Sequence, residues 1–328
     1  MTSSKTTSLL SVEALSVSFE TRRGAVHVIQ DMSFELKRGR TLGIVGESGS
    51  GKSVSSLAVM GLLPPTAKIG TGRGMFDGRD ILKLSEGEMQ SLRGGRLAMI
   101  FQDPMTSLNP SFTVGFQIEE SLRTHGVKGD LHAKSIELMA QVGIPDPALR
   151  LESYPHQLSG GMSQRVMIAM AIACSPDLLI ADEPTTALDV TIQAQILALL
   201  KKIQADRGMG LILITHDIGV VAQMADDIVV MYAGHVMESG PKDDVIHRPK
   251  HPYTQALLQS LPGSHVLAEF RSRLPTIPGL VPDLFARPSG CQLNPRCPYV
   301  IEKCKAAVPP LRQVGPNTVR CIRQEETL

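Results

Sequence analysis

A glycine-rich loop between two apolar segments constrains this chain more than any other feature. The apolar run at 40–45 is typical of a buried strand, and it leads directly into GESGSGKS at 46–53. Residues 54–60, which follow the loop, are predicted to form a helix. A strand, the pattern G-x-x-x-x-G-K-S and a helix, in this order, are the context of a P-loop. The chain is therefore predicted to bind the phosphates of a nucleoside triphosphate.

Each residue type in the loop has a physical task. Glycines let the backbone curl so that successive N–H groups point at phosphate oxygens, and the positive end of the following helix faces the same anion. Lys52 is expected to reach the β- and γ-phosphates, and the Ser53 hydroxyl to ligate Mg²⁺. The alternative is a glycine-rich turn with a chance Gly-Lys-Ser, which the flanking strand and helix disfavour. The predicted ATP-binding residues of the loop are Gly46, Glu47, Ser48, Gly49, Ser50, Gly51, Lys52 and Ser53.

A second apolar run, at 178–181, ends on two carboxylates. Asp182 at such a strand end can hold Mg²⁺, directly or through water. The adjacent Glu183 is then placed to polarise the attacking water as the general base. An aspartate that caps the next helix is the alternative, but the glycine loop earlier in the chain favours the magnesium site. Together the two elements predict hydrolysis of the bound nucleotide.

A third motif, LSGGMSQ at 158–164, lies between them. Here the chain resembles the ABC-type ATPases, the nucleotide-binding subunits of ABC transporters, over roughly residues 10–260. The resemblance implies that Ser159, Gly160, Gly161 and Gln164 contact ATP held by a second subunit. Glycines before the apolar stretch at 166–174 are also a plausible backbone-amide anion site in their own right. Both halves of a two-subunit site are present, so the chain is expected to be a competent ATPase.

The resemblance assigns further residues, in family order. Phe19 matches the aromatic that stacks on adenine, and Gln102 in IFQDP matches the glutamine that touches Mg²⁺ or water and senses the membrane partner. Asp189, in Ala-Leu-Asp at 187–189, matches the D-loop. His216 in ITHD matches the histidine that contacts the γ-phosphate and is expected to assist Glu183 and Lys52 in catalysis. Met162 and Ser163 differ from the common Gln-Arg, with little expected effect.

Periodicity along the chain predicts an α/β fold. Residues 12–40 alternate apolar and polar in short pieces, which is typical of antiparallel strands. Helical spacing dominates from about 104 to 165, and helices and strands alternate afterwards, which builds a parallel sheet with helices on both faces. With the resemblance, we expect a P-loop ABC-type ATPase core with an N-terminal antiparallel β subdomain and an inserted helical subdomain. The predicted domains are a nucleotide-binding domain at 1–260, with the helical subdomain at about 104–165, and a Cys/Pro-rich extension at 261–328.

Composition excludes several classes of protein. The net charge is +1, from 33 basic and 32 acidic residues, there is no tryptophan, and aromatic residues make up 4%. This is neither a polyanion-binding surface nor a set of base-stacking platforms, so no nucleic-acid partner is expected. No apolar run approaches the roughly 18 residues of a membrane span, and the first ten residues have too short an apolar core for a signal peptide. The protein is expected to be cytosolic in itself and to reach a membrane through a partner.

The C-terminal extension holds four of the five cysteines, Cys291, Cys297, Cys304 and Cys321, with the spacing C-x5-C-x6-C-x16-C. Disulfides are disfavoured for an ATP-hydrolysing protein in a reducing compartment. The residues leave three alternatives: a [4Fe–4S] cluster, whose thiolate spacing can be loose, a zinc site, whose cysteine pairs are usually closer, or free thiols. The fifth, Cys174, is expected to pack in the core.

The sequence around these cysteines is similar to one branch of the ABC family. HRPKHPYTQALLQSLP at 247–262 and the later GCQLNPRCPYVIEKC resemble the tail of the ATPases of bacterial dipeptide, oligopeptide and nickel importers. The resemblance implies a [4Fe–4S] cluster on the four cysteines, with a structural or interface role and zinc as the alternative. His251 is expected to be a packing or capping residue.

This branch also implies partners and a location. We expect a second, different ATPase subunit, two transmembrane permeases and an extracytoplasmic binding protein, at the cytoplasmic face of the bacterial inner membrane, where this chain is peripheral. The predicted function is to energise import of di- or oligopeptides, with nickel, glutathione or another cargo as the alternative. A soluble ABC ATPase acting on nucleic acid or ribosomes is the rival class. It is disfavoured because such proteins carry a second nucleotide domain, long insertions or a strongly basic surface.

Overall fold

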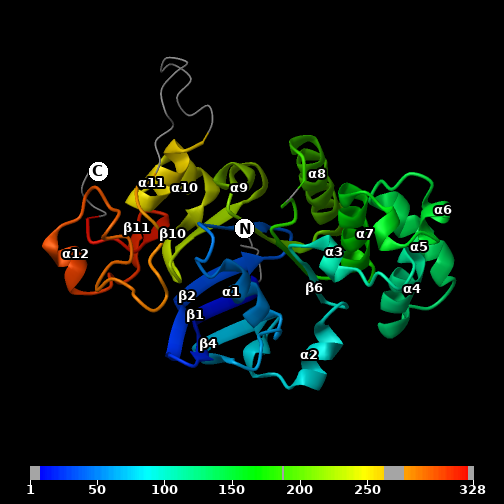
Figure 1. Ribbon diagram of the computed structural model, residues 1–328, viewed down its shortest axis with the longest axis horizontal. Coiled ribbons are helices and arrows are strands. Elements are labelled where there is room, and N and C mark those ends of the chain that lie inside the picture. Colours follow the sequence, from blue (N-terminus) through cyan, green and yellow to red (C-terminus); the bar gives the residue numbers. More distant parts are fainter. Residues whose placement is uncertain (1–7, 187, 262–276, 324–328) are drawn as a thin grey trace, which may run out of the picture. The chain divides into compact units, whose positions relative to one another are not determined.

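The structure is a computed structural model that describes residues 8–186, 188–261 and 277–323. Figure 1 labels its helices and strands, which divide into two compact units. The P-loop unit comprises Leu10–Leu36, Thr41–Leu82 and Thr215–Leu328, and the signature unit comprises Met1–Leu9, Lys37–Arg40 and Lys83–Ile214. Each unit is described by itself.

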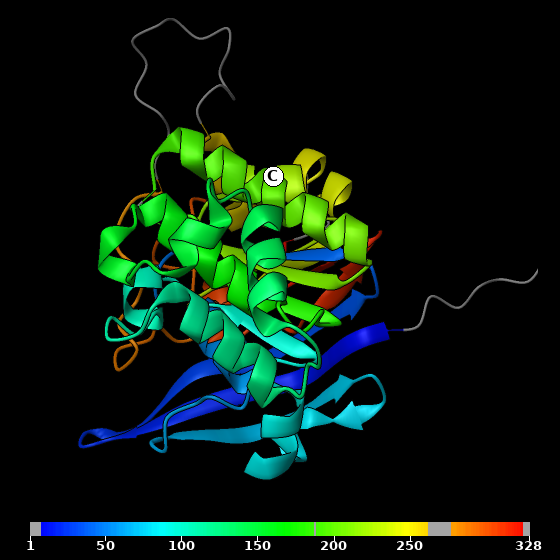
Figure 2. The same cartoon turned by 90° about the vertical axis from the view of Figure 1, so that its right-hand side faces the viewer.

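An antiparallel sheet forms the first layer of the P-loop unit, and its long strands are the blue ribbons of Figure 2. Apolar side chains on alternate positions of its first strand, such as Leu15 and Val17, are fully buried, as the alternating pattern predicts. A register shift between Glu13 and Ser16 bends this strand against its neighbour. The strand order is β2 (Gly24–Lys37), β1 (Ser8–Thr21), β4 (Ala67–Phe76) and β5 (Arg79–Asp80).

A second sheet in the same unit carries the P-loop. Its strand β3 (Thr41–Val45) is buried at every residue and pairs in parallel with β9 (Asp227–Tyr232). Burial on both faces explains the unbroken apolar run in the sequence. On the other side of β9, the order continues with β10 (His235–Pro241), β12 (Asn317–Val319) and β11 (Arg312–Val314), all antiparallel. The C-terminal extension therefore adds two strands to the sheet that positions the P-loop.

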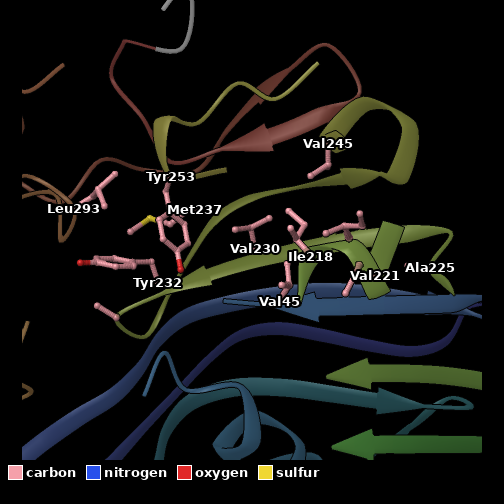
Figure 3. Packing of buried hydrophobic residues seen from close by; sticks show 12 residues of the cluster. Val45, Ile218, Val221, Ala225, Val230, Tyr232, Met237, Val245, Tyr253 and Leu293 are labelled. Carbon is pink, nitrogen blue, oxygen red and sulfur yellow. The ribbon is translucent and has the colours of Figure 1, made fainter. Parts of the chain in front are cut away.

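Helices cover this sheet and close its core. The cluster in Figure 3 joins Val45 of β3, Val221 of α9, Val230 and Tyr232 of β9, and Tyr253 of α11, together with Leu293 from the cysteine-rich extension. Residues as far apart in the chain as Val45 and Leu293 thus share one apolar core in the P-loop unit. Its helices are α1 (Lys52–Val59), α9 (Ile218–Met224), α10 (Lys242–His247), α11 (Pro252–Gln259) and α12 (Glu302–Ala306).

The signature unit has three neighbouring parallel strands, β8 (Gly210–Thr215), β7 (Leu178–Asp182) and β6 (Leu97–Ile100), in that order. The helices α4, α5, α6 and α7 pack against one another, and side chains cap several of them, as Thr113 caps α4 and Asp130 caps α5. Its helices are α2 (Glu86–Leu92), α3 (Pro104–Ser107), α4 (Val114–Thr124), α5 (Leu131–Gln141), α6 (Pro147–Leu151), α7 (Gly160–Ile172) and α8 (Val190–Arg207). Two 3-10 helices lie at Ile81–Lys83 and Pro155–Gln157, the first spanning the boundary between the units.

The predicted fold class is confirmed, with two differences in detail. The helix expected at 166–174 begins at Gly160, because Ser159 caps it and both glycines form its first turn. The strands β10, β11 and β12 were not predicted from the sequence. None of the helices in the described part of the chain is long and apolar enough to cross a membrane.

Candidate nucleotide-binding site

Close packing of the backbone forces glycine into the P-loop at two points. A Cβ atom on Gly46 would lie 2.1 Å from the carbonyl oxygen of Met231, a clash that backbone cannot relieve cheaply. Gly51 has φ +99°, a left-handed conformation that favours glycine. Two backbone hydrogen bonds hold the loop in shape. The Ser50 N–H donates to the Glu47 carbonyl oxygen at 3.2 Å, and the Gly234 N–H donates to the Ser50 carbonyl oxygen at 3.0 Å. The curled backbone expected from the motif is therefore present.

The lysine of the motif is held over its own loop. Lys52 is 4% exposed, and its Nζ donates to the carbonyl oxygens of Gly46 at 2.8 Å and Glu47 at 3.0 Å. An ammonium in this position faces the concavity where a P-loop receives phosphate. Ser53 follows as the second residue of α1 and is partly buried. Ser48 and Gly49, at the tip of the loop, are exposed.

At the end of β7 in the signature unit, the two predicted carboxylates occupy different environments. Asp182 is the last residue of the strand and is buried, whereas Glu183 has a left-handed backbone with φ 46°. That conformation costs a non-glycine residue roughly 1–2 kcal/mol and is frequent at functional sites. The Glu183 N–H donates to the Ile214 carbonyl oxygen at 2.9 Å, which holds the strained residue against β8.

The Glu183 carboxylate has two partners within the signature unit. Its Oε2 accepts from Thr186 Oγ1 at 2.9 Å and from Gln102 Nε2 at 3.2 Å. The structure therefore brings the predicted general base and the predicted Q-loop glutamine together, although Gln102 lies 81 residues earlier in the chain. Thr186 was not singled out from the sequence. No sequence pattern around Thr186 links its hydroxyl to the glutamate three residues earlier, so no local signal marks it.

The signature motif forms the start of α7. Ser159 is the exposed N-cap, and its Oγ accepts from the Met162 N–H at 3.3 Å. Gly160 is exposed, whereas Ser163 and Gln164 are buried, so the accessible part of the motif ends before Ser163. The 13-residue α7 thus directs unpaired backbone N–H groups outward at its N-terminus, which suits an anion.

The remaining predicted site residues lie within a strand or directly beside a helix or strand. Asp189 is exposed and caps α8 by accepting from the Ile192 N–H at 2.9 Å. Ala187, in the same predicted D-loop, lies outside the described residues. His216 is exposed directly after β8, and Phe19 is half-buried in β1.

All four cysteines of the extension line one cavity, together with His251 and Arg323. Burial, together with the three other cysteines, raises the pKa of the Cys291 thiol to about 11. Within 8–186, 188–261 and 277–323, however, no three histidine, cysteine or acidic side chains are placed as a metal ion requires. The thiols are gathered but not arranged around one point.

His251 has the capping role expected for it. It is 1% exposed and its Nδ1 accepts from the Tyr253 N–H at 3.0 Å, which caps α11. Burial lowers its pKa to about 3, so the imidazole is neutral at physiological pH. The contacts of Tyr253, and of Arg296 in the extension, with Glu47 of the P-loop were not foreseen from the sequence.

Comparison with known proteins agrees with this arrangement. Residues 29–186 match the family model "ABC transporter", and residues 237–304 match "Oligopeptide/dipeptide transporter, C-terminal region". The chain is 55% identical over 309 residues to the dipeptide transport ATP-binding protein DppD of Escherichia coli, covering 94% of both chains. It is 50% identical to the protein of the same name from Bacillus subtilis, over 97% of this chain and 95% of the relative.

Solved structures show the same fold. The dimeric post-hydrolysis ATP-binding cassette MJ0796 bound to ADP and Pi aligns with a TM-score of 0.64 at 25% identity, covering 71% of this chain and 98% of the cassette. The cassette cbiO1 from Clostridium perfringens, part of the transporter complex cbiONQ, aligns with a TM-score of 0.62 at 28% identity, over 74% and 91% of the two chains. With P-loop, strand-end carboxylates and signature helix in family order, this chain belongs to the family of ABC transporter ATP-binding proteins.

Proposed function

We propose that this chain is the ATP-hydrolysing subunit that energises import of di- or oligopeptides across a membrane. The observation that carries the proposal is the joint match of an ABC cassette and of the oligopeptide/dipeptide C-terminal region in one chain. The curated relatives named as dipeptide transport proteins match along nearly the whole length, extension included. The ATPase does not contact the cargo in the proposed assembly. The cargo assay described below therefore decides between peptides and the alternatives, nickel or glutathione.

The proposed mechanism assigns one task to each residue. Lys52 and the backbone amides of 46–53 bind the phosphates, and Phe19 stacks on adenine. Ser53, Gln102 and Asp182 offer hydroxyl, amide and carboxylate oxygens, the hard ligands that Mg²⁺ prefers; when bound, the ion neutralises phosphate charge. Glu183 takes the proton of the attacking water, and His216 contacts the γ-phosphate. Ser159, Gly160 and Gly161, with Asp189 of the D-loop, close over the nucleotide of a second ATPase subunit.

Substitution of the general base tests this assignment. Glu183→Gln keeps the side chain's shape but removes its basicity, so ATP is expected to bind normally while turnover falls by about 10²–10⁴-fold. Glu152→Gln, at an exposed glutamate in the same unit, is the matched control and is expected to keep wild-type turnover. Equal turnover in wild type and Glu183→Gln would refute the role of this carboxylate.

The proposed partners are a second, different ATPase subunit, two transmembrane permeases and an extracytoplasmic binding protein, with this chain peripheral at the cytoplasmic face of the inner membrane. The family membership supports an ATPase dimer that acts with permeases. Purification of the tagged chain from native membranes, followed by mass spectrometry, tests the assembly, and the recovered binding protein is then screened for cargo. Recovery only from the soluble fraction, alone or with nucleic acid, would contradict the transport proposal.

We also propose that Cys291, Cys297, Cys304 and Cys321 hold a [4Fe–4S] cluster. Their convergence on one cavity supports this, and the bound metal would displace the protons of thiols whose pKa burial raises. Anaerobic purification and analysis of iron, acid-labile sulfide and zinc separate a cluster from zinc and from free thiols. Cys304→Ser is expected to lower the bound metal, whereas Cys174→Ser, in the signature unit, is expected to leave it unchanged.

A further inference from the structure

The C-terminal extension contacts the P-loop directly, at Glu47. Arg296 lies in the turn between Cys291 and Cys297, and its Nη1 is 3.1 Å from Oε1 and 3.0 Å from Oε2 of Glu47. The Arg296 side chain is 5% exposed and that of Glu47 is 28% exposed, so the pair is largely shielded from solvent. Both residues belong to the P-loop unit.

Other contacts fix the direction of the guanidinium. Its Nε donates to the Pro278 carbonyl oxygen at 2.8 Å, and its Nη2 donates to the Ile277 carbonyl oxygen at 3.1 Å. Nη1 also donates to the Tyr232 hydroxyl at 3.2 Å, and the guanidinium lies over the Tyr232 ring, 5.6 Å from its centre. The fork is thus held by a fixed set of acceptors, an arrangement that lysine cannot reproduce.

Tyr253, from the HPYT motif, secures the same loop residue from its backbone. Its hydroxyl accepts from the Glu47 N–H at 3.0 Å, and its ring packs on Tyr232 with centres 4.8 Å apart (Figure 3). The Glu47 carbonyl oxygen, in turn, accepts from Lys52. Every polar group of Glu47 is therefore engaged, and Tyr253 and Arg296 supply the partners of the amide and the carboxylate.

We propose that Arg296 is a positioning residue of the nucleotide site: it holds and neutralises Glu47 so that the P-loop accepts phosphate. This rests on the proposed binding of ATP at the P-loop. A carboxylate in a phosphate-binding loop repels the incoming anion unless a cation compensates it. Arg296 supplies that compensation from the extension, and Tyr253 keeps the Glu47 amide in place. The extension is then part of the nucleotide-binding apparatus.

Variants that remove either the positive charge of Arg296 or the negative charge of Glu47 distinguish this role from simple attachment of the extension. Arg296→Met leaves the Glu47 carboxylate uncompensated, so the Kd for ATP is expected to rise about tenfold. Glu47→Gln leaves an uncompensated cation beside the loop, so the Kd is expected to fall below the wild-type value. Glu47→Gln added to Arg296→Met removes the repulsion and is expected to return the Kd to within about threefold of wild type.

The control is a second buried arginine of the same extension. Arg320 donates to the carbonyl oxygens of Val236 and Pro309 and pairs with Asp31, without contacting the P-loop. Arg320→Met is expected to lower the urea midpoint of the full chain while leaving the Kd for ATP within about twofold. Arg296→Lys keeps the charge, so its Kd is expected to lie between those of wild type and Arg296→Met.

The experiment is titration of the full-length chain and each variant with MgATP by isothermal calorimetry, on protein shown to be folded by its urea transition. A raised Kd in Arg296→Met that Glu47→Gln restores supports the proposal. An unchanged Kd in Arg296→Met, or a raised Kd that Glu47→Gln does not restore, overturns it. If wild type itself bound no ATP, the proposed function would fail, which is a different result from a failure of the variants alone.

Discussion

Removal of a single oxygen atom from Tyr253 tests the contact between the HPYT motif and the P-loop. Tyr253→Phe keeps the ring, which is fully buried and packs 4.8 Å from that of Tyr232, so no cavity forms. The change deletes the acceptor of the Glu47 N–H, a hydrogen bond of 3.0 Å. A buried donor left without its partner lowers the free energy of unfolding by about 1–3 kcal/mol. Because the Glu47 N–H is only partly buried, a loss of about 1–2 kcal/mol is expected.

That loss is measurable by thermal unfolding. For a unit of roughly 150–250 residues, 1 kcal/mol shifts Tm by about 2–4 °C, so Tyr253→Phe is expected to lower Tm by about 2–8 °C. The Kd for ATP is expected to rise a few-fold, because Glu47 loses the partner that fixes its amide. Tyr299→Phe, at a ring that is 36% exposed, is the control and is expected to change neither quantity. The reasoning fails if Tyr253→Phe matches wild type in both.

Two further predictions concern the backbone of the P-loop and a buried histidine. Gly46→Ala is expected to abolish ATP binding, because the added methyl would lie 2.1 Å from a backbone carbonyl oxygen; Gly70→Ala, where nothing lies within 4 Å, is expected to bind ATP normally by calorimetry. Burial and two neighbouring arginines lower the pKa of His235 to about 3. The unfolded chain has a histidine pKa of about 6.5, so between about pH 6.5 and 3 it binds one more proton at this residue than the folded chain does. His235 therefore lowers the free energy of unfolding by up to about 1.4 kcal/mol per pH unit as the pH falls below about 6.5. His235→Leu is expected to flatten that dependence in urea titrations at pH 7.0 and 5.5, and an unaltered slope would show that the histidine is charged or exposed.

The elements of the candidate site that depend on local sequence were predictable. A strand, a glycine-rich loop and a helix within about twenty residues predict the P-loop. An apolar run that ends at a charged residue predicts β7 and places Asp182 at its end. The start of α7 was placed six residues late, because Gly160 and Gly161 lower helix propensity. Ser159 compensates as N-cap, an effect that a propensity argument on the apolar stretch leaves out.

The contacts that depend on tertiary structure were not predictable. Arg296 and Glu47 are 249 residues apart, and β12 pairs with β10 through strands of only three and seven residues. Nothing in the sequence near Arg296 identifies a P-loop partner, and the nearby cysteines direct attention to metal binding instead. HPYT was recognised as a marker of the branch, but the role of its tyrosine is apparent only where the hydroxyl meets the Glu47 amide.

The energetics of the Arg296–Glu47 pair favour a functional reason for it. The extension is already attached by the pairing of β12 with β10 and by Leu293 in the shared core, so an additional anchor is not required. A largely buried ion pair is a poor anchor, since desolvation offsets much of the attraction and apolar residues of similar volume often stabilise a fold as well or better. An apolar pair here would hold the extension equally well but would place no compensating charge on the loop. Arg296 pairs with the one acidic residue of the anion-binding loop at 46–53. The phosphate that this loop is proposed to bind explains why the partner is an arginine.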